Sequence, residues 1–127
     1  MQGETPLTIF TVDDSEVVFK NMGSLLTESK NISWIGHAFS LADAQKQITE
    51  KNPKIVILDI QLKEDSSFEL LQYISKQQPA ITVIMFTNLS SEPYREKCKK
   101  LGAKYFLDKS TEFEKIPQIL EELLQNK

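Results

Sequence analysis

Several side chains able to bind or accept a phosphoryl group follow short apolar runs in this 127-residue sequence. The plainest case is Asp59, which comes directly after the aliphatic run Ile55–Leu58. A carboxylate there can act as a nucleophile or bind a hard cation, although it could equally serve only to cap the next turn. Other apolar runs also end in, or just before, polar side chains. The full set is Asp13, Asp14, Asp59, Thr87 and Lys109.

Together these side chains predict a magnesium-dependent phosphoacceptor site. Three neighbouring carboxylates repel one another unless a cation neutralises them, and Mg²⁺ accepts carboxylates, backbone carbonyls, waters and phosphate oxygens as ligands. The metal also lets an anionic phosphodonor approach an anionic nucleophile. Asp59 could then attack phosphorus and carry an aspartyl phosphate. Lys109 would supply a positive charge for one phosphoryl oxygen, and Thr87 a hydroxyl donor for another.

The elements that must position these residues are five strands alternating with five helices. The uninterrupted run Ile55–Leu58 indicates a central strand buried on both faces. The alternation predicts a parallel sheet with helices on both faces and right-handed crossovers. Because the carboxyl ends of parallel strands meet at one edge of the sheet, we expect the polar set to gather there. The expected strands are residues 7–12, 33–39, 55–58, 81–86 and 105–107.

Start and stop signals bound the expected helices. Ser with an acidic residue three positions later marks two helix starts, Pro93 marks another, and Gly or Asn-Pro marks ends. Pro117 disfavours a helix start before Ile116. The expected helices run from Asp14 or Ser15 to about Asn31, from Ser40 to before Asn52, from Ser66 to before Pro79, from Pro93 to Gly102, and over the stripe from Ile116 to Leu124.

Composition narrows the classes of protein further. The chain suits one domain, and its 40% hydrophobic and 26% charged residues are ordinary for a globular protein. A net charge of −3 argues against direct nucleic-acid binding. We expect no membrane insertion and a cytoplasmic location, because no long apolar run or signal pattern is present. Cys98 and His37 are the only cysteine and histidine, which leaves oxygen ligands for any metal. Cys98 is expected to fill core space and His37 to be structural.

The chain resembles the receiver domain of two-component response regulators over nearly its whole length. The motifs that carry the resemblance are Val12-Asp13-Asp14-Ser15, Ile57-Leu58-Asp59-Ile60, Phe86-Thr87 and Asp108-Lys109. The resemblance implies a doubly wound, flavodoxin-like α/β fold with strand order 2-1-3-4-5. It also implies a signalling module that receives a phosphoryl group from a histidine kinase or phosphotransfer protein. Such a module catalyses only its own phosphorylation and dephosphorylation. We expect one receiver domain over residues 1–127, with its core at about 6–126 and no output domain.

The resemblance assigns a role to each residue of the set and adds two more residues. Asp59 would be the phosphoacceptor, Asp14 a direct Mg²⁺ ligand, and Asp13 a ligand through water. Asp59 and the backbone carbonyl of Gln61 would complete the protein's metal ligands. Lys109 would pair with the phosphate. Thr87 would be the switch hydroxyl, with Phe106 as the aromatic switch residue.

Four positions depart from the family pattern. Lys63 stands where Pro is usual, Ser67 replaces Gly, and Asn88 replaces a smaller residue. Ser110 follows Lys109 where the family usually has Pro, so the expected cis peptide bond is lost. None of these changes removes a chemical group, so phosphorylation is expected to persist.

Three alternatives stay open. The chain could be a degenerate receiver that binds proteins without being phosphorylated. An aspartyl-phosphate hydrolase is less favoured, because Gln61 stands where such enzymes carry a second Asp. A flavin or nucleotide module is disfavoured because no Gly-rich loop follows the first strand. The basic residues between 95 and 104 form either a solvated face or, with Phe106 and the last helix, a docking surface.

Overall fold

A five-stranded parallel sheet forms the centre of the computed structural model, which describes residues 6–27 and 31–125. The strand order is β2-β1-β3-β6-β7, which is 2-1-3-4-5 when only the strands of this sheet are counted. The predicted flavodoxin-like topology is therefore confirmed. The strands are β1 (Leu7–Val12), β2 (Ile32–Ala38), β3 (Ile55–Leu58), β6 (Thr82–Thr87) and β7 (Tyr105–Asp108).

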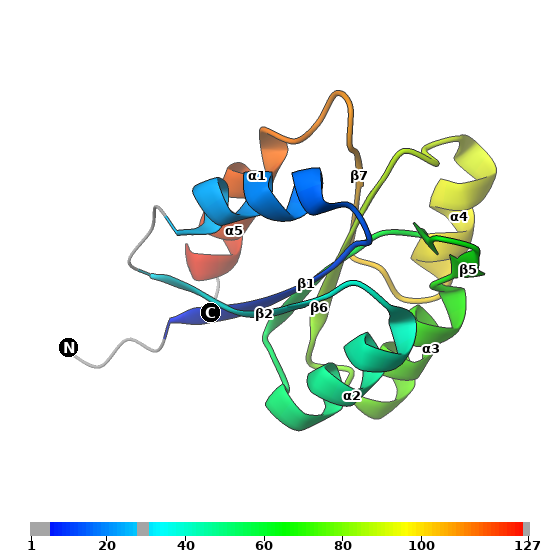
Figure 1. Cartoon of the computed structure of the whole chain (residues 1–127), viewed down its shortest axis with the longest axis horizontal. Coiled ribbons are helices and arrows are strands. Elements are labelled where there is room, and N and C mark those ends of the chain that lie inside the picture. Colours follow the sequence, from blue (N-terminus) through cyan, green and yellow to red (C-terminus); the bar gives the residue numbers. More distant parts are fainter. Residues whose placement is uncertain (1–5, 28–30, 126–127) are drawn as a thin grey trace.

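Helices cover both faces of the sheet (Figure 1). One face carries α1 and α5, and the other carries α2, α3 and α4. The alternation of side chains along β3 divides the core, because Val56 and Leu58 belong to one apolar cluster and Ile55 and Ile57 to the other. The helices are α1 (Glu16–Leu26), α2 (Leu41–Lys51), α3 (Phe68–Gln77), α4 (Glu92–Lys100) and α5 (Lys115–Gln125).

The first helix is shorter than the sequence predicted. It ends at Leu26, and both the amide and the hydroxyl of Thr27 donate to the Gly23 carbonyl, at 3.2 and 2.6 Å. The predicted end near Asn31 is wrong, because β2 begins at the next residue; residues 28–30 lie outside the described part. The Ser15 side chain caps the start of α1, so of the two predicted cap residues, Asp14 and Ser15, the second is confirmed.

The start of α3 also differs from the prediction. The cap residue is Ser67 rather than Ser66, and its side chain makes no capping hydrogen bond. Ser66 instead ends a short hairpin of β4 (Gln61–Leu62) and β5 (Asp65–Ser66), in a segment where no strand was expected. Its turn places Lys63 at φ 58°, a left-handed conformation that is uncommon for lysine and that was not predicted.

The remaining helix predictions agree closely with the structure. The left-handed Asn52, at φ 45°, ends α2, and α5 begins at Lys115, one residue before the predicted Ile116. Cys98, on the inner face of α4, is fully buried in the core, as expected. Among the described residues, no helix combines the length and apolar character that a membrane span requires.

The edge strand β2 contains an irregularity at Ile35. The pairing with β1 shifts there, since Ile9 faces Trp34 and Phe10 faces Gly36. The Lys51 ammonium donates a hydrogen bond to the Ile35 carbonyl at 3.0 Å. A Cβ atom at Gly36 would stand 2.7 Å from the Phe10 ring and 2.9 Å from the Lys51 nitrogen. Glycine is therefore required for the close approach of these side chains.

Candidate functional site

The carboxylates of Asp13 and Asp59 meet the Lys109 ammonium at the carboxyl edge of the sheet. Asp13 follows β1, Asp59 follows the adjacent β3, and Lys109 follows the edge strand β7. The Lys109 Nζ atom lies 2.7 Å from Asp13 Oδ2 and 2.7 Å from Asp59 Oδ2. The three side chains are only 5%, 9% and 12% exposed for Asp13, Asp59 and Lys109 respectively. One cation thus bridges two nearly buried carboxylates.

Burial and pairing act in opposite directions on these charges. Burial raises the pKa of Asp13, and the Lys109 ammonium and the Ser15 amide offset this only in part. Burial disfavours the charged form of Lys109, but the hydrogen bonds to Asp13 and Asp59 outweigh it, so the pKa of Lys109 is raised. Lys109 therefore carries its charge at neutral pH and stabilises both carboxylates.

Asp14 completes an all-oxygen cluster. One potential ligand atom from each of Asp13, Asp14 and Asp59 lies within 4.8 Å of the others. Asp14 Oδ2 also accepts a hydrogen bond from the Lys63 amide at 2.6 Å. Carboxylate ligands are commonly oriented by such outer partners. The donor set and its spacing fit a small, hard divalent cation.

Ser67 holds the backbone at Asp59, a role that the sequence did not predict. Its hydroxyl donates to the Asp59 carbonyl at 2.6 Å, and the Ser67 side chain is fully buried. The Ser67 amide donates to the Ile60 carbonyl at 2.7 Å, while the Asp59 amide donates to Val12 at 3.2 Å. The only signal in the sequence was that Ser67 stands where a receiver usually has Gly.

Thr87 ends β6, the neighbour of β3, at the edge of the sheet where the carboxylate cluster lies. Its side chain is 1% exposed, and its hydroxyl oxygen accepts a hydrogen bond from the Leu89 amide at 3.1 Å. The Lys109 amide donates to the Thr87 carbonyl at 3.0 Å. The backbone thus joins Thr87 directly to the residue that carries the ammonium.

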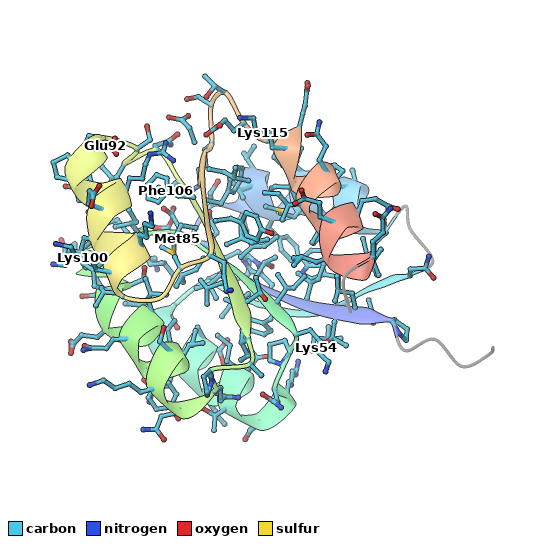
Figure 2. All side chains as sticks on the ribbon, turned by 180° about the vertical axis from the view of Figure 1, so that it is seen from behind. Lys54, Met85, Glu92, Lys100, Phe106 and Lys115 are labelled. Atoms are coloured by element: carbon cyan, nitrogen blue, oxygen red, sulfur yellow. The ribbon has the colours of Figure 1, made fainter. Side chains whose placement is uncertain are left out.

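Phe106 lies apart from the carboxylates, on the α4 side of the sheet. It pairs with Met85 across the β6–β7 ladder, and Figure 2 shows its side chain between α4 and the sheet. The Arg95 guanidinium lies 4.6 Å from the centre of the Phe106 ring, and Arg95 Nη1 donates to the Phe106 carbonyl at 3.4 Å. The ring is therefore sandwiched between the core and a cation.

Gln61 lies in the β4–β5 hairpin next to the acidic cluster. Its side-chain amide donates to the Lys63 carbonyl at 3.0 Å. Gln61 is paired with Ser66 in the hairpin. On one side of this pair is the Leu62–Asp65 pair next to the turn, and on the other is the hydrogen bond from the Ser67 amide to the Ile60 carbonyl. This is a non-hydrogen-bonded pair, in which the Gln61 backbone carbonyl is not used by the hairpin ladder.

His37, in the edge strand β2, contacts the backbone of Asp13. The Trp34 indole donates to the Thr11 hydroxyl at 3.0 Å, and this hydroxyl lies 2.6 Å from His37 Nδ1. His37 Nε2 lies 3.0 Å from the Asp13 carbonyl, which can only accept, so Nε2 carries the proton. Burial lowers the pKa of His37, although the bond to Asp13 opposes the effect. A structural role, as predicted, accounts for this histidine.

Comparison with known proteins identifies the family. The model of the response regulator receiver domain matches residues 9–121. The chain therefore belongs to the receiver domain family of two-component response regulators, a family of signalling modules.

Two curated relatives show how much of a longer protein the chain matches. The chain is 28% identical over 117 residues to the uncharacterized transcriptional regulatory protein YesN of Bacillus subtilis, covering 91% of this chain and 32% of YesN. It is 26% identical over 113 residues to the sensory transduction protein LytT of Enterococcus faecalis, covering 89% of this chain and 46% of LytT. The chain thus spans less than half the length of these two relatives.

The fold is that of solved receiver domains. The isolated REC domain of RcsB from Salmonella enterica, solved in the presence of phosphomimetic BeF3⁻, superimposes with a TM-score of 0.87. The match covers 97% of this chain and 91% of that one, at 16% identity. At such low identity the likeness establishes the fold alone.

Proposed function

We propose that this receiver domain accepts a phosphoryl group on Asp59 from a histidine kinase or a phosphotransfer protein, and that this changes a protein-binding face. The observation that carries the proposal is the bridge of Lys109 between Asp13 and Asp59, at 2.7 Å from each. The bridge places a fixed cation beside the nucleophile, where the charge of an incoming phosphoryl group must be balanced.

The transfer forms one bond and breaks one. A carboxylate oxygen of Asp59 attacks phosphorus, and a new O–P bond forms as the N–P bond of the donor's phosphohistidine breaks. The electron pair of the broken bond returns to the imidazole nitrogen, which takes up a proton from water. Lys109 already contacts Asp59 Oδ2, so its ammonium lies close enough to pair with a phosphoryl oxygen.

Asp13, Asp14, Asp59 and the Gln61 carbonyl are the proposed Mg²⁺ ligands. Their support is the 4.8 Å spacing of the carboxylate cluster and the position of the Gln61 carbonyl outside the hairpin ladder. Asp14 is the proposed direct ligand, with the Lys63 amide orienting its carboxylate, and Asp13 the ligand through water. When bound, Mg²⁺ would neutralise the carboxylates and the phosphoryl oxygens during transfer.

Thr87 and Phe106 are the proposed switch residues. The Thr87 hydroxyl oxygen now accepts from Leu89 within its own loop, and a phosphoryl oxygen would offer its proton a charged acceptor. Movement of that loop would alter the support of α4, where Arg95 stacks on Phe106. The proposed output is therefore a change at the α4–β7 face, which binds a downstream protein. The net charge of −3 supports a protein rather than nucleic acid as the direct partner.

The site does not favour hydrolysis of outside substrates. Gln61 carries an amide, which cannot act as a general acid, and its nitrogen donates to Lys63. The remaining alternative is a degenerate receiver, which would bind proteins without being phosphorylated. Whether Asp59 accepts a phosphoryl group distinguishes this alternative from the proposal.

Intact mass measurement after incubation with Mg²⁺ and acetyl phosphate tests phosphorylation. The wild-type chain should gain the mass of one phosphoryl group, and Asp59→Asn should gain none. Asp65→Asn is the matched control, because Asp65 is exposed in the nearby hairpin, and it should be labelled like the wild type. No labelling of the wild type, or equal labelling of Asp59→Asn, would reject Asp59 as the acceptor.

A further inference from the structure

The carboxylate of Asp108 joins two loops at the edge of the site. Asp108 is the last residue of β7, beside Thr87, the last residue of β6. Its Oδ2 atom accepts a hydrogen bond from the Ser90 hydroxyl, in the loop after β6. Its Oδ1 atom accepts from the Ser110 amide at 2.8 Å and from the Ser110 hydroxyl at 2.6 Å, in the loop after β7. The two oxygens thus hold different segments of the chain.

The two loops are those that carry the proposed phosphate-contacting groups. The loop after β6 leads away from Thr87, and the loop after β7 contains Lys109. The backbone already joins these residues, because the Lys109 amide donates to the Thr87 carbonyl at 3.0 Å. The Asp108 carboxylate extends this link beyond the last paired residues of the strands. Two hydrogen-bonded links therefore connect the two loops, one through the backbone and one through the Asp108 carboxylate.

The second loop is closed by reciprocal bonds at the same residue. The Asp108 amide donates to the Glu112 carboxylate at 2.9 Å, and the Glu112 amide donates to the Asp108 carbonyl at 2.9 Å. The separate bond from the Ser110 amide to Asp108 Oδ1 requires an N–H group at position 110, which proline lacks. Receivers usually carry proline at this position. Here the Asp108 carboxylate holds the loop through its hydrogen bonds to Ser110, whereas a proline would restrict the loop through its ring.

We propose that Asp108 is a positioning residue that couples the loop of Thr87 to the loop of Lys109, so that the two move as one unit when the site is occupied. The role of this coupling in signalling rests on the proposed function. The hydrogen bonds of the Asp108 carboxylate to Ser90 and Ser110 do not, because they are present in the unphosphorylated chain. The pKa of Asp108 is lowered to about 2 by hydrogen bonds from Ser110 and Ser90, so the bridging group is ionised at neutral pH.

Amide exchange with solvent, measured by NMR on the full chain without phosphodonor, tests the bridge. Ser90→Ala should speed exchange at the Ser110 amide by about two- to fivefold, the scale of a partly exposed polar interaction. That amide lies on the opposite loop, so a local loss of structure around residue 90 does not explain the change. Ser90→Thr, which restores a hydroxyl, should return the rate toward that of the wild type. Ser91→Ala is the matched control, because the Ser91 side chain makes no capping hydrogen bond.

Equal exchange rates at Ser110 in Ser90→Ala and Ser91→Ala would overturn the proposal. In a second arm, beryllofluoride and Mg²⁺ are titrated into the wild-type and Ser90→Ala chains. The amide signals of Leu89 and Ser110 should shift together in the wild type and separately in Ser90→Ala. Joint shifts in both proteins would also overturn the proposal. If beryllofluoride moved no signal, the proposed phosphoacceptor function would fail, while the exchange arm would still decide the bridge.

Discussion

Replacing Ser67 with alanine should destabilise the chain although it removes a single oxygen atom. The Ser67 hydroxyl is fully buried and donates to the Asp59 carbonyl at 2.6 Å. The variant loses this hydrogen bond and also leaves a buried carbonyl without its donor. Such a loss costs about 1–3 kcal/mol in the free energy of unfolding. At about 4 °C per kcal/mol for a domain of this size, the melting temperature should fall by about 4–12 °C.

Urea and thermal unfolding of three proteins would measure the effect. Ser24→Ala is the matched control, since Ser24 is exposed in α1, and it should stay within about 0.5 kcal/mol of the wild type. The slope of the free energy against urea should be the same in all three, so that a change of midpoint reports stability. If Ser67→Ala also stayed within about 0.5 kcal/mol of the wild type, the inferred bond would not support the Asp59 backbone.

Four further predictions each concern one residue. Gly102→Ala should destabilise the chain by more than about 1 kcal/mol, because Gly102 has φ 112° and its Cβ would lie 2.0 Å from Ser75 Oγ. Gly23→Ala in α1, where the nearest atom of Trp34 is 3.4 Å away, should stabilise it by about 0.5–1 kcal/mol; thermal melts that moved in the same direction would contradict this pair. Cys98 is fully buried, and burial raises the pKa of its thiol to about 11, so alkylation at pH 8 should be much slower in the native than in the denatured chain, and equal rates would contradict this burial. Because the pKa of Asp108 is about 2 when folded and 3.8 ordinarily, its contribution to stability is present above pH 3.8 and lost as the pH falls toward 2; Asp108→Asn should show a shallower acid loss in urea titrations, and an unchanged pH profile would exclude this linkage.

The sheet was predictable because local sequence and global topology agree there. Each main strand is a short apolar run, and the polar residue that ends it, such as Asp59 or Thr87, must lie at the carboxyl edge once the strands are parallel. The strand order, which the alternation of elements and the family resemblance supplied, brings Asp13, Asp59 and Lys109 to one edge of the sheet, where the side chains make contact.

The loops were not predictable by the same reasoning. Ser66 and Ser67 are both good cap residues; α3 starts after Ser67, whose buried hydroxyl bonds the Asp59 carbonyl, while the Ser66 hydroxyl accepts from the Phe68 amide at 3.2 Å. The Lys63 turn contains no glycine, and its left-handed conformation accompanies a hydrogen bond to Asp14, a residue distant in sequence. Such contacts depend on the assembled molecule, whereas the sequence signals used for turns and caps are local.

The irregular edge at Ile35 limits how far the sheet can grow. A regular outer strand offers a row of free amides and carbonyls, which is a template for intermolecular β-pairing and aggregation. In β2 the register shift interrupts that row. The Lys51 ammonium donates a hydrogen bond to the Ile35 carbonyl and adds a positive charge there. A second chain approaching β2 therefore meets a shifted register and a charged side chain, and both disfavour regular β-pairing along this edge.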